Sequence, residues 1–196
     1  MTLQRRAVVS ELLRDRGDLL VVAGLGSTSW DITAAGDSPL SFPTWGAMGQ
    51  AAMIGLGLAL AQPERRVLVV TGDGEMLMGM GSLATIGVQQ PKNLTVVVID
   101  NERYGETGMQ RTHTAFGVDL AAVALGCKIP NAITVSGDLG AVRRMIYEKA
   151  GPNFAAIKVS DEKLPLVLPP KDGVLLKARF RRALLGDSAD VLPEER

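Results

Sequence analysis

The chain of 196 residues has one cysteine, one histidine, few aromatic residues and no excess of either charge. A single cysteine, Cys127, excludes an internal disulfide and an all-cysteine zinc site, and it fits a reducing compartment. Lysine and arginine number 21, as do aspartate and glutamate, so no net field favours nucleic acid or an anionic membrane as a partner. The first residues lack the apolar core of a signal peptide, and the most apolar window, residues 47–61, is too short and glycine-rich to cross a bilayer. We therefore expect a cytoplasmic protein that binds neither nucleic acid nor membrane.

What the chain does contain is typical of one folded domain, with 46% hydrophobic and 21% charged residues. Runs of β-branched residues alternate with stretches of helical composition, which is typical of a parallel sheet covered on both faces. We expect strands at 18–23, 66–71, 94–100, 132–135 and 154–159, and helices at 46–61, 75–89, 118–125, 138–150 and 175–185. The sequence thus predicts a doubly wound α/β fold. Residues 1–165 form the expected domain, and residues 166–196 form a C-terminal arm and short helix that could dock a partner.

Polar clusters follow two of these expected strands. Gly-Asp-Gly at 72–74 follows one strand, and Asp-Asn-Glu at 100–102 follows the next. A right-handed crossover between parallel strands brings Asp73 and Asn101 to the same edge of the sheet. Their oxygen atoms suit Mg²⁺, and glycine amides at the start of a helix favour phosphate. The residues alone therefore predict a site for Mg²⁺ and a diphosphate; the alternative is a pair of ordinary turns.

The two clusters together resemble the diphosphate-binding signature of thiamin-diphosphate-dependent enzymes, and the resemblance covers roughly residues 19–159. It implies thiamin diphosphate and Mg²⁺ as cofactors, with the metal held by Asp73, Asn101 and the backbone carbonyl of Arg103. It assigns no ligand role to Asp100. The remaining residues that it implies for cofactor binding are Ser27, Gly46, Met48, Gly72, Gly74, Glu75, Tyr104 and Gly105. Met48 would wedge between the two rings of the cofactor, the Gly46 carbonyl would accept from its aminopyrimidine, and the backbone of Glu75 would contact the diphosphate.

The same resemblance extends to a branch of the family and to a partner. The runs GDGEMLMGMGSLATI and DNERYGETGMQRTHT are similar to decarboxylases of sulfopyruvate and phosphonopyruvate. In this family the glutamate that activates the cofactor lies on a separate pyrimidine-binding domain. The resemblance therefore implies a hetero-oligomer, in which a second subunit supplies that glutamate and a small 2-oxo acid such as 3-sulfopyruvate is the substrate. A carboligase of the acetolactate synthase type and a non-catalytic regulatory subunit are the alternatives.

Three ionisable residues follow the expected metal turn and are candidates for catalysis. Arg111 suits bidentate capture of a carboxylate, sulfonate or phosphonate. His113, the single histidine, could transfer protons near neutral pH, and Glu106 could act as an acid. Glycines in the same segment would allow it to close over a substrate. The alternative is that this segment is a solvated loop.

Overall fold

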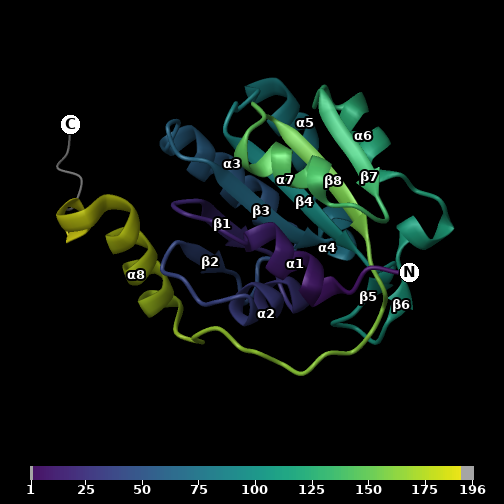
Figure 1. Cartoon of the computed structure of the whole chain (residues 1–196), viewed down its shortest axis with the longest axis horizontal. Helices are drawn as coiled ribbons and strands as arrows, with labels where there is room; N and C mark the ends of the chain where they lie inside the picture. Colours follow the sequence, from purple (N-terminus) through teal and green to yellow (C-terminus); the bar gives the residue numbers. More distant parts are fainter. Residues whose placement is uncertain (1, 191–196) are drawn as a thin grey trace.

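The computed structural model describes residues 2–190, and its centre is a six-stranded parallel sheet (Figure 1). The strands lie in the order β2-β1-β3-β4-β8-β7. Their bounds are β1 Leu20–Ala23, β2 Ser41–Pro43, β3 Val67–Gly72, β4 Leu94–Asp100, β7 Asn131–Val135 and β8 Asn153–Lys158. The chain runs outward from β1 to β2 and then returns to β3 on the other side of β1, which makes the crevice between β1 and β3 the switch point of a doubly wound sheet. The predicted α/β fold is confirmed.

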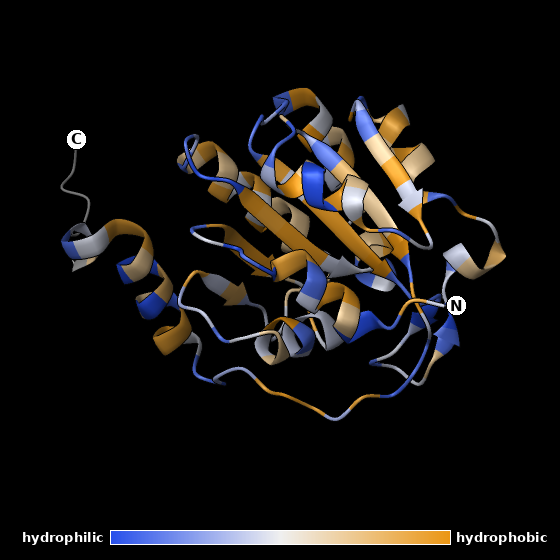
Figure 2. Cartoon of the chain, viewed as in Figure 1, coloured by the Kyte–Doolittle hydropathy of each residue, from blue (hydrophilic) through white to orange (hydrophobic). Residues whose placement is uncertain are grey.

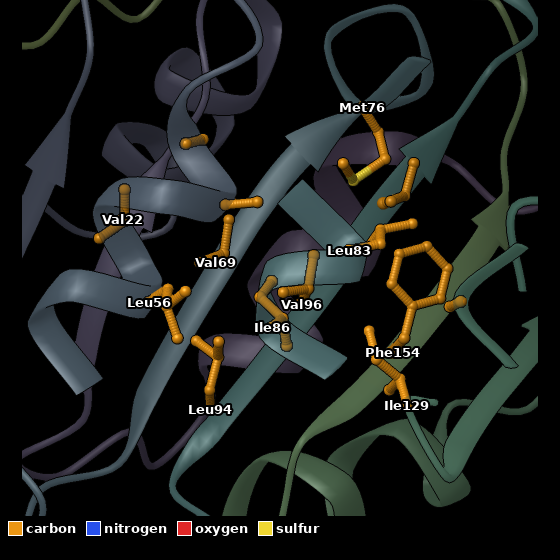
Figure 3. Packing of buried hydrophobic residues seen from close by; sticks show 14 of the residues in the cluster. Val22, Leu56, Val69, Met76, Leu83, Ile86, Leu94, Val96, Ile129 and Phe154 are labelled. Carbon is orange, nitrogen blue, oxygen red and sulfur yellow. The ribbon is translucent and has the colours of Figure 1, made fainter. Parts of the chain in front are cut away.

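Helices cover both faces of this sheet, because the strand residues that point to either face are apolar. The central strands are accordingly hydrophobic along most of their length (Figure 2). One face carries α1 Arg5–Leu13, α2 Ser27–Ala34 and α7 Gly140–Tyr147. The other carries α3 Ala51–Ala61, α4 Asp73–Met78, α5 Ser82–Gln89 and α6 Leu120–Gly126. On this second face Val69, Val96 and Phe154 pack beneath Leu56, Met76, Leu83 and Ile86 (Figure 3). The strands are therefore buried on both sides, as their uninterrupted apolar runs predict.

Glycine allows α3 to approach the sheet closely. A β-carbon added at Gly55 would lie 2.1 Å from Cγ2 of Val69 on β3. The small residues of this helix therefore allow it to pack closely on the sheet.

Several elements differ from the sequence prediction. No helix or strand was predicted between residues 24 and 45, but this segment contains α2 and β2, and the unpredicted α1 lies before β1. The helix expected at 75–89 is interrupted, because α4 ends at Met78 and Gly79 packs against the backbone of Gly49, where a β-carbon would lie 2.0 Å from the carbonyl oxygen. The helix expected at 46–61 begins at Ala51. A short hairpin of β5 Arg103–Tyr104 and β6 Gln110–Arg111 leads into the 3₁₀ helix η1 His113–Phe116.

The C-terminal segment leaves β8 as an extended arm, passes below α2, and ends in α8 Gly173–Leu185 and η2 Gly186–Asp190 (Figure 1). Trp45 Nε1 donates to the Pro170 carbonyl at 2.8 Å, and the ring of Phe180 packs edge-on against Phe42 of β2. The expected helix at 175–185 is confirmed, whereas residues 191–196 of the expected arm lie outside the described part of the chain. No helix within residues 2–190 has the length and apolarity needed to span a membrane.

Candidate active site

A cavity opens at the carboxyl ends of β1, β3 and β4, at the switch point of the sheet. It is lined by Arg5, Leu25, Ser27, Met48, Gly72, Asp73, Gly74, Glu75, Ile99, Asn101, Arg103, Tyr104, Gly105, Glu106 and Thr107. Every residue expected to contact the cofactor is in this set except Gly46, which is exposed. Because parallel strands end at the same edge, the two polar clusters meet here, as their spacing predicts.

Asp73 begins α4, and its side chain is buried at one side of this cavity, with the residue only 2% exposed. Its Oδ2 accepts a hydrogen bond from the Thr112 hydroxyl at 2.6 Å, and the Thr114 hydroxyl lies 3.4 Å away. Burial raises the pKa of the Asp73 carboxyl to about 6; the Thr112 hydroxyl opposes this rise, and the charge of Asp100 adds to it. The ion pairs recorded within residues 2–190 include none to Asp73. A buried carboxylate without a cationic partner is costly, so the position favours a bound cation.

Asp100, at the end of β4, already has such a partner. Its Oδ2 lies 2.8 Å from Nζ of Lys158 on β8, and its Oδ1 accepts from the Thr114 hydroxyl at 2.8 Å. Thr114 thereby links Asp100 to Asp73. The two adjacent carboxylates differ in their surroundings, and only Asp73 is left for an external cation.

The turn after β4 supplies further oxygen atoms. Asn101 Oδ1 accepts from the backbone N–H of Arg103 at 3.0 Å, and Glu102 between them has a positive φ of 60°. The Arg103 side chain points to Asp161, with Nε 3.1 Å from the carboxylate. Within residues 2–190 no three histidine, cysteine, aspartate or glutamate side chains form a metal-binding group. A metal here would therefore depend on one carboxylate, one amide and one carbonyl, a hard oxygen set that fits Mg²⁺ with phosphate ligands.

Glu75 connects α4 to the turn after β1. Its Oε2 accepts from the Thr71 hydroxyl at 2.8 Å and from the Leu25 N–H at 3.1 Å. Burial raises the pKa of this carboxyl, and the two donors oppose the rise. A β-carbon at Gly24 would lie 1.8 Å from Oε2, so a larger residue there would displace the Glu75 carboxylate. The sequence prediction used only the backbone of Glu75; the structure shows that its side chain joins two edges of the cavity.

The ring of Tyr104 packs against the glycine turn at residues 72–74. A β-carbon at Gly74 would lie 2.6 Å from the Tyr104 ring, and the Tyr104 hydroxyl is 3.2 Å from Nδ1 of His113. Met48 lies across the cavity in the loop before α3, where the preceding Ala47 has a positive φ of 57°. The lining therefore combines polar groups at the strand ends with the apolar side chains of Leu25, Met48 and Ile99.

The three candidate catalytic residues separate in the structure. Glu106 lines the cavity beside Gly26, where a β-carbon would meet its carboxylate at 2.2 Å. Arg111 and His113 do not line it. Arg111 donates to the Ala115 carbonyl at 2.8 Å and lies 4.5 Å from the centre of the Phe116 ring. Within this chain they are turned outward, because alternate residues of the segment, Thr112 and Thr114, face inward.

Sequence reasoning missed Arg5, Thr112 and Thr114. Arg5 reaches the cavity from α1, a helix that was not predicted. Threonines two residues apart carry no motif of their own, and only their alternation with Arg111 and His113 could have indicated an inward face.

Comparison with known proteins agrees with this geometry. The family model described as "Thiamine pyrophosphate enzyme, C-terminal TPP binding domain" matches residues 29–157. The sulfopyruvate decarboxylase subunit beta of Methanothermobacter thermautotrophicus is 37% identical over 97% of this chain and 100% of its own length. The phosphonopyruvate decarboxylase of Streptomyces viridochromogenes is 39% identical over 91% of this chain, which covers 44% of that protein.

A solved structure shows the same fold. Benzoylformate decarboxylase from Polynucleobacter necessarius superposes with a TM-score of 0.65 at 19% identity, over 85% of this chain and 35% of that one. The chain therefore belongs to the thiamin diphosphate (thiamine pyrophosphate) enzymes and contains their C-terminal cofactor-binding domain.

Proposed function

We propose that this chain is the diphosphate-binding subunit of a heteromeric, Mg²⁺-dependent thiamin diphosphate enzyme that decarboxylates a 2-oxo acid. The observation that carries the proposal is Asp73, a buried carboxylate without a cationic partner in the described chain, beside the amide of Asn101. Relatives that match almost the whole chain are decarboxylases of sulfopyruvate and phosphonopyruvate. Family membership and donor chemistry thus support the same site.

The residues of this chain would bind the cofactor through its diphosphate. Asp73, the side chain of Asn101 and the carbonyl of Arg103 would hold Mg²⁺. The other proposed contacts are Ser27, Gly72, Gly74, the backbone of Glu75, Tyr104 and Gly105 to the diphosphate end, and Gly46 and Met48 to the rings. Bound thiamin diphosphate would supply the electron sink that makes loss of CO₂ from a 2-oxo acid possible. Thr112 and Thr114 orient the metal carboxylate, and Tyr104 shields the glycine turn from water.

A second subunit is the source of the remaining groups in this proposal. The Methanothermobacter relative, which this chain covers completely, is a beta subunit, whereas the Streptomyces relative is a single chain more than twice as long as the matched part. The arm and α8 are a proposed docking segment, separate from the domain at 1–165. Their exposed apolar side chains support it: Leu166, Leu168, Val174 and Leu175.

The proposed substrate is a small 2-oxo acid with an anionic tail, of which 3-sulfopyruvate is the first candidate. Glu106, Arg111 and His113 remain proposed catalytic residues, the last two only if the partner or the substrate brings their segment over the cavity. A carboligase is the second candidate, since acetolactate synthase isozyme 1 of Escherichia coli is 25% identical over 64% of this chain. Product analysis separates them, because a decarboxylase releases an aldehyde and CO₂ from one substrate whereas a carboligase joins two.

The test is reconstitution of the chain with a pyrimidine-domain subunit, followed by CO₂ release from 3-sulfopyruvate with thiamin diphosphate, with and without Mg²⁺. Asp73→Ala is expected to abolish activity. Glu64→Ala is the matched control, because Glu64 is exposed and precedes β3 at the end of the strand away from the cavity. This variant should retain activity. Full activity of the Asp73→Ala complex would contradict the proposal and favour a regulatory role for this subunit.

A further inference from the structure

Arg5 is a buried cation at the edge of the proposed cofactor cavity. It lies in the first turn of α1 and is 7% exposed. It lines the same cavity as Asp73 and Asn101, and it also lines an adjoining hollow that includes Trp30 and Glu162. A guanidinium in this position costs free energy unless anions or other acceptors surround it.

Asp31 holds one side of this guanidinium. Asp31 on α2 is fully buried, and its Oδ2 lies 2.9 Å from Arg5 Nε. Its Oδ1 lies 3.0 Å from Nε of Arg6, whose Nη2 donates to the Pro165 carbonyl at 2.8 Å. One carboxylate thus serves two arginines, so neither arginine has a buried counter-ion to itself. Within residues 2–190 no hydrogen bond is recorded from either Nη of Arg5, which leaves these donors for a ligand.

The charges around the cavity call for such a cation. A diphosphate ester carries about three negative charges near neutral pH, since terminal phosphates lose their second proton near pH 6. Mg²⁺ bound to the Asp73 carboxylate contributes a net charge of only +1, and the cavity wall adds the carboxyls of Glu75 and Glu106. The cations that line the cavity are Arg5 and Arg103, and Arg103 is paired with Asp161 at 3.1 Å. Arg5 is also paired, but its partner Asp31 is shared with Arg6, so Arg5 is the lining cation best able to balance the diphosphate.

We propose that Arg5 binds the cofactor's diphosphate as a cation additional to the metal, and that Asp31 is the positioning residue that fixes its guanidinium. This inference rests on the proposed function, because it assigns a further residue to the same site. It differs from a purely structural ion pair in one respect: Arg5 should contribute more to binding a diphosphate than to binding a monophosphate.

The test measures ligand dissociation constants of the full-length chain by ³¹P NMR and calorimetry at millimolar concentrations with Mg²⁺. The probes are pyrophosphate, thiamin diphosphate, thiamin monophosphate and inorganic phosphate. Arg5→Gln is expected to raise Kd for both diphosphates at least about tenfold, which is equivalent to about 1.4 kcal/mol, with a smaller effect on both monophosphates. Arg5→Lys keeps the positive charge but loses the planar guanidinium that can donate two parallel hydrogen bonds, so its effect on Kd should be intermediate.

Arg16→Gln is the matched control, because this partly buried arginine bonds to Ser41 and Leu40 at the other end of β1. It should leave every Kd within about twofold of wild type. Thermal unfolding of each variant checks folding, and Arg5→Lys carries the comparison if Arg5→Gln does not fold. Equal losses for diphosphates and monophosphates, or unchanged binding in both Arg5 variants, would overturn the inference.

Asp73→Asn separates this inference from the proposed function. If Asp73→Asn loses pyrophosphate binding while Arg5→Gln retains it, the metal site stands and the role of Arg5 is refuted. If wild type binds none of the probes either alone or assembled with its partner subunit, or if neither variant differs from it, both proposals are refuted. In the reconstituted enzyme, a raised KM for the 2-oxo acid with unchanged cofactor affinity would assign Arg5 to the substrate's anionic tail and refute the inference.

Discussion

Replacing Asp73 by asparagine should stabilise the metal-free protein while removing its ability to bind the cofactor. Burial raises the pKa of this carboxyl from the ordinary 3.8 to about 6. At 1.36 kcal/mol per pH unit, this difference of (6 − 3.8) corresponds to about 3 kcal/mol of unfavourable free energy in the folded, ionised state. Asparagine has nearly the same shape and can accept from the Thr112 hydroxyl, but it carries no charge to bury.

The pH dependence follows from the sign of this difference. The folded pKa lies above the unfolded one, so the folded state holds more protons between about pH 4 and pH 6. The contribution of Asp73 to stability is therefore most favourable below pH 4 and is lost as the pH rises through 6. The advantage of Asp73→Asn should grow across this range and become constant above about pH 7, at up to about 3 kcal/mol.

Urea unfolding followed by circular dichroism, in the presence of a chelator at several pH values between 4 and 8, measures this difference. The matched control is Asp100→Asn, which removes the 2.8 Å ion pair with Lys158 and should destabilise the protein by about 1–3 kcal/mol. Saturating Mg²⁺ and thiamin diphosphate should stabilise wild type by about 2.7 kcal/mol at a hundred times Kd, but should not stabilise Asp73→Asn. An Asp73→Asn protein no more stable than wild type at pH 8, or a difference that does not vary with pH, would refute the reasoning.

Three further predictions concern the support of the site and the fold. Thr112→Val removes the 2.6 Å donor to the metal carboxylate and should weaken Mg²⁺–pyrophosphate binding about tenfold in calorimetry; unchanged affinity would exclude an orienting role. Gly55→Ala places a methyl group 2.1 Å from a strand side chain and should cost about 1–3 kcal/mol in urea unfolding, whereas Gly57→Ala meets open space; equal stability of the two would contradict the packing. Arg179→Ala breaks an ion pair at 2.7 Å on the surface and should cost less than about 1 kcal/mol while speeding limited proteolysis of the arm. Unaltered proteolysis would show that α8 does not depend on this pair.

The strands were the most predictable part of the fold. β4 was predicted with its observed bounds, Leu94–Asp100, because every residue of it is buried and its β-branched run is uninterrupted. α2 was missed because Ser27–Ala34 is rich in serine and threonine, which have weak helix propensity. Its start is held by local hydrogen bonds that leave no hydrophobic pattern: the hydroxyls of Thr28 and Ser29 donate to the Gly24 carbonyl at 2.9 and 2.7 Å. β2 was missed because its three residues are too few to show the alternation of a strand.

The candidate site also contains some residues that were predictable from the sequence and others that were not. Asp73 and Asn101 were predictable because each follows a strand directly, and parallel strands bring such positions together. The inward face of the segment after the hairpin was not predictable, because it depends on register. A shift of one residue would exchange Thr112 and Thr114 for Arg111 and His113. Arg5 could not be assigned to the cavity, since nothing local in α1 indicates which residue reaches the sheet edge.

The most direct test of the central claim is a crystal structure of this chain, assembled with its partner, with Mg²⁺ and thiamin diphosphate bound. The account predicts Mg²⁺ at about 2.1 Å from a carboxylate oxygen of Asp73, the amide oxygen of Asn101 and the carbonyl of Arg103, with diphosphate oxygens completing its shell. A diphosphate bound elsewhere, or a metal that does not contact Asp73, would contradict it.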